Sequence, residues 1–76
     1  MITEIYRMDE RTGNISREAS YSLPAEDALM THCRRTHGVE ITGMRHSDSR
    51  QNTVYADYWD RNTGKGYVYM AYQESR

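Results

Sequence analysis

The sequence has little of several residue types, and each shortage excludes a class of structure. Its 76 residues include one cysteine, so no disulfide forms within the chain and a reducing compartment is favoured. No apolar run approaches the ~20 residues that a membrane helix needs, and the N-terminal residues do not have the pattern of a secretion signal. We therefore expect a cytoplasmic protein without a membrane segment.

Neither sign of charge is in excess. Ten basic and eleven acidic residues give a net charge of -1, and the two signs alternate along the chain without long blocks. A nucleic-acid-binding protein would show a clear excess of basic residues, and a protein that imitates DNA by its charge would show a clear excess of acidic residues. Lys65 is the only lysine. Because guanidinium groups bind carboxylates and stack on aromatic rings, the preference for arginine favours a protein interface; codon bias is the alternative explanation.

Apolar residues are also few, at 37% of the chain with a mean hydropathy of -0.97. Eight aromatic residues offset part of this shortage, because each buries a large area. The apolar positions are periodic, which argues against a disordered chain. A chain of this length has room for one hydrophobic core, so we expect residues 1–76 to form a single domain.

The pattern of apolar, turn and capping residues predicts one helix and about five strands. The helix has Pro24 at its first helical position, ends near His37 and is capped by Gly38 in the left-handed conformation. Period-two alternation and β-favouring residues predict the strands, which are residues 2–8, 15–21, 39–42, 53–61 and 66–73. The predicted fold is α+β, an antiparallel sheet with the helix packed on one face, in the order β-β-α-β-β-β.

One stripe of the predicted helix carries the residues expected to face the sheet. Their three- and four-residue spacing places them together: Ala25, Ala28, Leu29, His32, Cys33 and Thr36. We expect Leu29 and Ile41 to be central to the core, and Cys33 to be packed and unreactive.

A single helix covers one face of a sheet, so the other face is wet, dimerised or occupied by a partner. If the helix covers the face with Val54 and Val68, a cluster of rings is left on the open face. These rings are Tyr55, Trp59, Tyr67 and Tyr69, with Met44 beside them and with Arg45 and Arg61 as rim or anchor contacts. The alternative is that tyrosine simply suits a half-exposed pleated surface.

Four patterns of the kind found in metal, catalytic or phosphate sites are incomplete. Cys33 and His37 have a spacing that suits a shared metal ion, but His32 and His46 do not complete a recognisable ligand motif. Cys33 also lies in the C-terminal half of the helix, where the helix dipole disfavours a thiolate nucleophile. The carboxylate pairs Glu26/Asp27 and Asp57/Asp60 diverge in direction, and residues 62–66 lack the spacing of a phosphate-binding loop. We expect no catalytic residues, no metal and no cofactor.

In length and element order the whole chain resembles the small accessory proteins of phages and mobile elements, and among these the anti-CRISPR proteins. The resemblance involves no motif, so it assigns no functional residue. It implies a stoichiometric inhibitor that occupies a surface of a host protein complex such as a CRISPR effector.

Two other functions fit the same pattern. A nucleic-acid-binding module would stack bases on the open-face rings and place Arg45, Arg50 and Arg61 on phosphates, although the net charge disfavours it. A structural protein would cover the second sheet face in a homodimer. The expected partner is a protein, and the chain itself is a monomer or a homodimer.

Overall fold

The fold was obtained as a computed structural model that describes residues 1–38, 44–46 and 53–74. It contains one helix, four strands of seven to ten residues and one strand of two residues. The elements are β1 (Ile2–Asp9), β2 (Ile15–Tyr21), α1 (Ala25–His37), β3 (Arg45–His46), β4 (Thr53–Asp60) and β5 (Lys65–Glu74). The α+β class, with one helix and an antiparallel sheet, is therefore confirmed.

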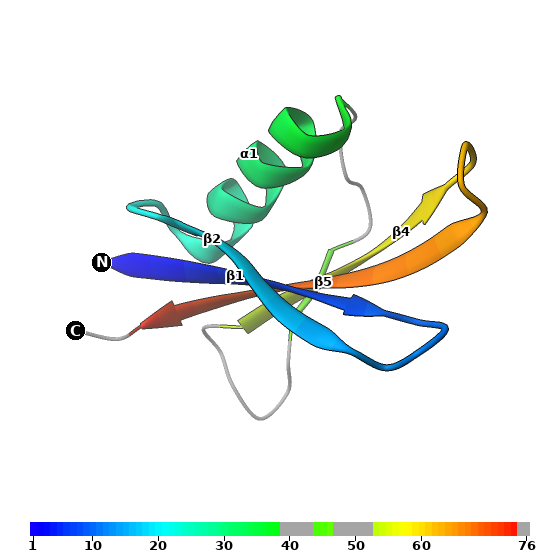
Figure 1. Cartoon of the computed structure of the whole chain (residues 1–76). Helices are drawn as coiled ribbons and strands as arrows, with labels where there is room; N and C mark the ends of the chain where they lie inside the picture. Colours follow the sequence, from blue (N-terminus) through cyan, green and yellow to red (C-terminus); the bar gives the residue numbers. More distant parts are fainter. Residues whose placement is uncertain (39–43, 47–52, 75–76) are drawn as a thin grey trace.

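The strands form one antiparallel sheet in the spatial order β2-β1-β5-β4-β3. The first and last strands of the chain are therefore neighbours at the centre, and each belongs to a long hairpin. Figure 1 shows α1 lying across one face, with the turns of both hairpins at the end of the sheet opposite the two chain termini. The strand predicted at residues 39–42 lies outside the described residues, and the short β3 is not predicted by the sequence analysis.

The two hairpin turns have the same sequence pattern, D-x-x-T-G, and the same chemistry. In each turn the aspartate carboxylate, from Asp9 or Asp60, accepts a hydrogen bond from the backbone N–H two residues later, at 2.8 and 2.9 Å. Gly13 and Gly64 close the turns with positive φ values of 76° and 69°, a conformation that glycine adopts without a steric penalty. The turns thereby fix the register of the strands that they join.

Helix α1 is held at both ends by backbone hydrogen bonds. Pro24 is the N-cap and not the first helical residue, so the predicted start is early by one position. The Ala25 N–H donates to Oε1 of Gln73 at 3.1 Å, which ties the helix start to β5. Gly38 adopts the left-handed conformation and its N–H donates to the Arg34 carbonyl, as predicted. No helix among the described residues is long and apolar enough to cross a bilayer.

The core between α1 and the sheet consists mainly of small residues around a few large ones. Leu29 and Tyr69 are both fully buried, which confirms the predicted place of Leu29. The helix stripe is confirmed at all its predicted positions except Thr36, which is exposed; Ile41 lies outside the described residues. The buried hydrophobic residues are Ile5, Ala25, Ala28, Leu29, Cys33, Val54, Ala56, Tyr69 and Ala71.

The register of β4 against β5 reverses the predicted faces of β5. Tyr69 lies opposite Ala56, and Tyr67 lies opposite Tyr58, so both tyrosines share the α1 face with Val54. The prediction that Tyr67 and Tyr69 lie on the open face is therefore wrong. Alternation separates the two faces within one strand, but only the pairing across the hairpin shows which face of β5 continues which face of β4.

We expect Leu29→Ala to reduce the free energy of unfolding by about 2 to 5 kcal/mol, because the truncation leaves a cavity in a core rich in alanine. Ile15→Ala is the control, since it removes a side chain that is 59% exposed on β2, and it should cost less than about 1 kcal/mol. Urea denaturation measures both variants. Equal losses would contradict the placement of the core.

Candidate functional site

The sheet face opposite α1 carries adjoining apolar side chains from three neighbouring strands. The pairing places Tyr6 of β1, Met70 of β5 and Tyr55 of β4 in one row, with Met8 and Val68 side by side in the next. We call this set the open-face strip: Tyr6, Met8, Tyr55, Val68, Met70 and Tyr72. Its members are half-buried, apart from Tyr72 at 37% exposed, and no described helix lies over them.

Ion pairs within the chain flank the open-face strip. On the β2 side, Arg17 donates to Oε2 of Glu4 at 2.7 Å, and this hydrogen bond lowers the pKa of the Glu4 carboxyl. On the β4 side, Arg45 donates to Oδ1 of Asp57 at 3.2 Å. Both arginines that border the strip are thus paired with carboxylates of their own chain, and the rim of the strip is polar with balanced charge.

The structure brings together only part of the predicted ring cluster. Tyr55 belongs to the open-face strip, and Trp59 lies on the same face near the β4–β5 turn, where it is 60% exposed. Arg45 borders the strip and Arg61 is exposed in that turn. The prediction that Met44 lies on the open face is wrong, because its half-buried side chain packs against the core.

Sequence reasoning missed most of the open-face strip. It overlooked Tyr6 and Met8, which alternate with the buried Thr3 and Ile5 along β1. That alternation is visible in the sequence, so period-two analysis of residues 2–8 identifies them. The β5 members of the strip become visible only when the register is known.

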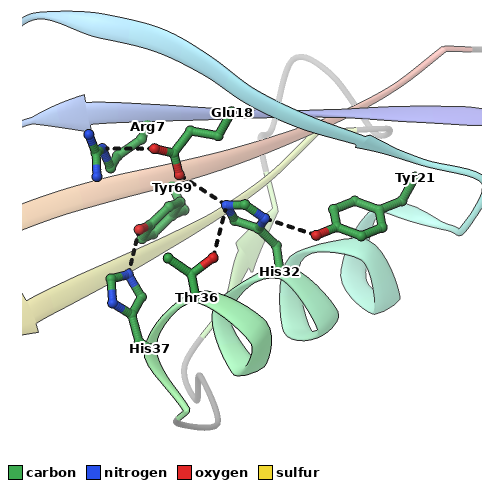
Figure 2. A network of polar contacts seen from close by, with 7 residues as sticks. All are labelled: Arg7, Glu18, Tyr21, His32, Thr36, His37 and Tyr69. Carbon is green, nitrogen blue, oxygen red and sulfur yellow. Dashed lines mark hydrogen bonds and ion pairs between the residues drawn. The ribbon is translucent and has the colours of Figure 1, made fainter.

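A network of polar contacts joins the sheet to α1 on the covered face (Figure 2). Its sheet side includes Glu18, the extra residue of a β-bulge, since Ile5 pairs with Ala19 while Tyr6 pairs with Arg17. The bulge turns the Glu18 side chain toward α1 instead of the open face. Its carboxylate forms an ion pair with Arg7, with Oε2 3.3 Å from Nε, and its Oε1 lies 3.0 Å from Nε2 of His32.

Both ring nitrogens of His32 have partners within this network. A carboxylate only accepts, so Nε2–H donates to Glu18 and, in the neutral ring, Nδ1 accepts the Tyr21 hydroxyl proton at 2.9 Å. His32 is 7% exposed. A catalytic histidine needs a nitrogen that can reach a substrate. The hydrogen bonds of His32 therefore connect the helix to the sheet.

His37 makes a second tie between α1 and the sheet. Its Nε2 lies 2.6 Å from the Tyr69 hydroxyl, and its ring stacks on Tyr58 with centroids 4.0 Å apart. Burial lowers the pKa of His37 and raises that of Tyr69, so both groups are neutral at pH 7. From the sequence, His37 was considered as the end of the helix and, with Cys33, as part of an incomplete metal motif, but its contact with Tyr69 was not predicted.

Cys33 is fully buried, as predicted, and burial raises the pKa of its thiol to about 11. The thiolate that would act as a nucleophile or a metal ligand is therefore scarce at neutral pH. Among the described residues no three His, Cys, Asp or Glu side chains are grouped to hold a metal ion; the side chain of His46 lies outside this description.

Comparisons with known proteins do not assign this site. No protein-family model, curated protein or solved structure matches the chain.

Acidification should reduce the stability of the fold, with a contribution from His37. The folded state lowers the pKa of this group below its ordinary value of 6.5, so the unfolded chain binds the proton more readily. The free energy of unfolding then decreases as the pH falls below about 6.5 toward the folded-state pKa. Urea denaturation at several pH values between 7 and 5 measures this decrease in the free energy of unfolding. His37→Gln should reduce the dependence of the free energy of unfolding on pH. Tyr69→Phe keeps the titrating group and should not abolish this dependence. An unchanged pH dependence in His37→Gln would refute the contribution of His37.

Native Cys33 should react slowly with a soluble aromatic disulfide reagent at pH 7.5, because its thiol is buried and protonated. Labelling should become fast in denaturing urea, which serves as the control for reagent activity. Fast labelling without denaturant would show that the helix stripe is accessible.

Proposed function

We propose that the chain is a non-catalytic module that binds a folded protein through the open-face strip. The observation that carries the proposal is the combination of adjoining apolar side chains with a rim of paired charges. Protein interfaces have this anatomy, with an apolar centre that is poor in charge and a polar edge. Apolar patches rimmed by polar residues mark interaction sites on proteins.

The pairing of the rim arginines favours a protein over a nucleic acid at this strip. A phosphate would have to displace Glu4 from Arg17 or Asp57 from Arg45, and the carboxylate released would then repel it. The net charge of -1 gives no long-range attraction for a polyanion. A second copy of the chain is the competing occupant, and sedimentation of the isolated protein distinguishes it.

The narrower prediction, a stoichiometric inhibitor of a complex such as a CRISPR effector, depends on the resemblance in length and element order. It stays a prediction. It requires that the purified protein inhibit such an effector at about equal molar amounts without being consumed, and an effector that works at full rate in excess protein would contradict it.

The binding proposal is tested by comparing the same substitution, methionine to lysine, on the open face of the sheet and on α1. Met70→Lys places a charge at the centre of the open-face strip. Met30→Lys makes the same change at a half-buried methionine of α1. Thermal unfolding first establishes that both variants are folded. A partner captured by the wild-type chain from host cells, then purified, should bind Met70→Lys at least about thirtyfold more weakly, a hot-spot magnitude. Met30→Lys should bind it normally.

Two results would overturn the proposal. One is equal partner affinity for the wild type, Met70→Lys and Tyr72→Ala. The other is a steep loss of affinity with salt, because phosphate binding through several cations falls by about a thousandfold or more between low and moderate salt, whereas docking on an apolar strip should change little.

A further inference from the structure

A depression interrupts the open face of the sheet at the end that carries the hairpin turns. Gly66 of β5 lies between Trp59 of β4 and Glu10, whose N–H donates to the Gly66 carbonyl at 3.1 Å. A Cβ atom at Gly66 would lie 2.5 Å from Oε2 of Glu10 and 3.3 Å from Cε3 of Trp59. The missing side chain therefore leaves room for the Glu10 carboxylate and the Trp59 ring to lie close to this point of the strand.

The depression is part of a pocket of about 360 Å³, a volume within the range of small-ligand sites. Besides Glu10, Trp59 and Gly66, its walls include Arg11 from one hairpin turn and Thr63 and Lys65 from the other. The indole ring is 60% exposed, so a planar group can stack on it.

The charges around the pocket differ from those around the open-face strip. Arg11 and Lys65 are exposed, and neither forms an ion pair within the described part of the chain. The nearby carboxylates of Asp9 and Asp60 accept hydrogen bonds from the backbone of their own turns. The pocket thus offers an aromatic surface, one acceptor-only group beside it and two cations at its edge.

We propose that this pocket binds a guanine nucleotide, with the base stacked on Trp59, its Watson–Crick edge on Glu10 and its phosphate near Arg11 and Lys65. Guanine is the base that presents two adjacent N–H donors on that edge, and a carboxylate has two acceptor oxygens to meet them. Uracil presents carbonyl acceptors on both sides of its single N–H, which a carboxylate repels. Stacking on the ring supplies affinity for any base, and Glu10 supplies the selectivity.

The same chemistry can come from a free nucleotide or from a single-stranded nucleic acid. A cationic side chain of a protein would also meet the indole and Glu10, but Arg11 and Lys65 would repel it. An acidic peptide would meet the two cations and leave Glu10 facing a like charge. The guanine nucleotide is the ligand that uses the indole ring, the carboxylate and both cations.

Trp59 is the only tryptophan of the chain, so its fluorescence reports on the pocket directly. Titration with guanosine monophosphate should quench it saturably, and uridine monophosphate should bind at least about fivefold more weakly, the lower end of base discrimination by a bidentate contact. Guanosine without phosphate should also bind more weakly, and added salt should reduce that difference. Absence of saturation at millimolar guanosine monophosphate, or equal binding of the two nucleotides, would overturn the proposal.

Variants followed by amide chemical shifts separate the roles of the lining residues. Trp59→Ala should abolish binding while Trp59→Phe retains part of it, and Glu10→Gln should bring the two nucleotides within about twofold of each other. Met30→Lys, on α1 and outside the lining of the pocket, should bind guanosine monophosphate as the wild type does. Persistent binding by a folded Trp59→Ala would refute the pocket.

A short single-stranded RNA with a guanosine at one end distinguishes the two sources of the base. If the RNA binds more tightly than the mononucleotide and Trp59→Ala abolishes this binding, the result supports the pocket and identifies nucleic acid as the source of the base. Equal or weaker binding supports it with a free nucleotide. Binding of an arginine-rich or a glutamate-rich peptide without binding of guanosine monophosphate would overturn it.

Discussion

The pairing of Ala56 with Tyr69 across β4 and β5 is the constraint on which the rest of the structure depends. A large ring opposite a methyl group leaves room for α1 to approach, and the Tyr69 hydroxyl reaches the last helical turn at His37. The same pairing sends Val68 and Met70 to the other face of β5. One register therefore determines both the core and the open-face strip, and a shift by one residue would exchange them.

The covered face compensates for scarce aliphatic residues with rings and directed hydrogen bonds. Alanines and two histidines occupy positions of α1 that in a larger domain often hold leucine or isoleucine. Polar groups are costly to bury unless they are paired, and His32 has a partner at each ring nitrogen. Such contacts depend on direction, so they specify how the helix sits on the sheet as well as holding it there.

The sequence was sufficient where the signals are local. The start of α1 was predicted to within one residue, Gly38 to the correct cap, and Leu29 and Cys33 to the core, because each depends on residues close in the chain. The faces of β5 were predicted wrongly, since their assignment depends on register across a hairpin. The Glu18 network was not predicted at all, because a bulge breaks the alternation on which strand analysis relies.

The candidate site was only partly accessible for the same reason. Tyr55 and Trp59 were placed on the open face correctly by alternation within β4, whereas Met70 and Tyr72 required the pairing of β5. Gly66 was predicted only as the point where the second hairpin turn meets the last strand. Its contribution is the absence of a side chain between two neighbours, and that absence has meaning only once Glu10 and Trp59 are known to flank it.

The bulge at Glu18 also affects how the sheet can grow. β2 is an edge strand, and an uninterrupted edge exposes a regular row of backbone donors and acceptors on which another chain can add a strand. The extra residue breaks that row near the middle of β2 and increases its local twist, so an incoming strand finds no long matching ladder. The device that brings a carboxylate to the helix thus protects this edge against fibril-like addition.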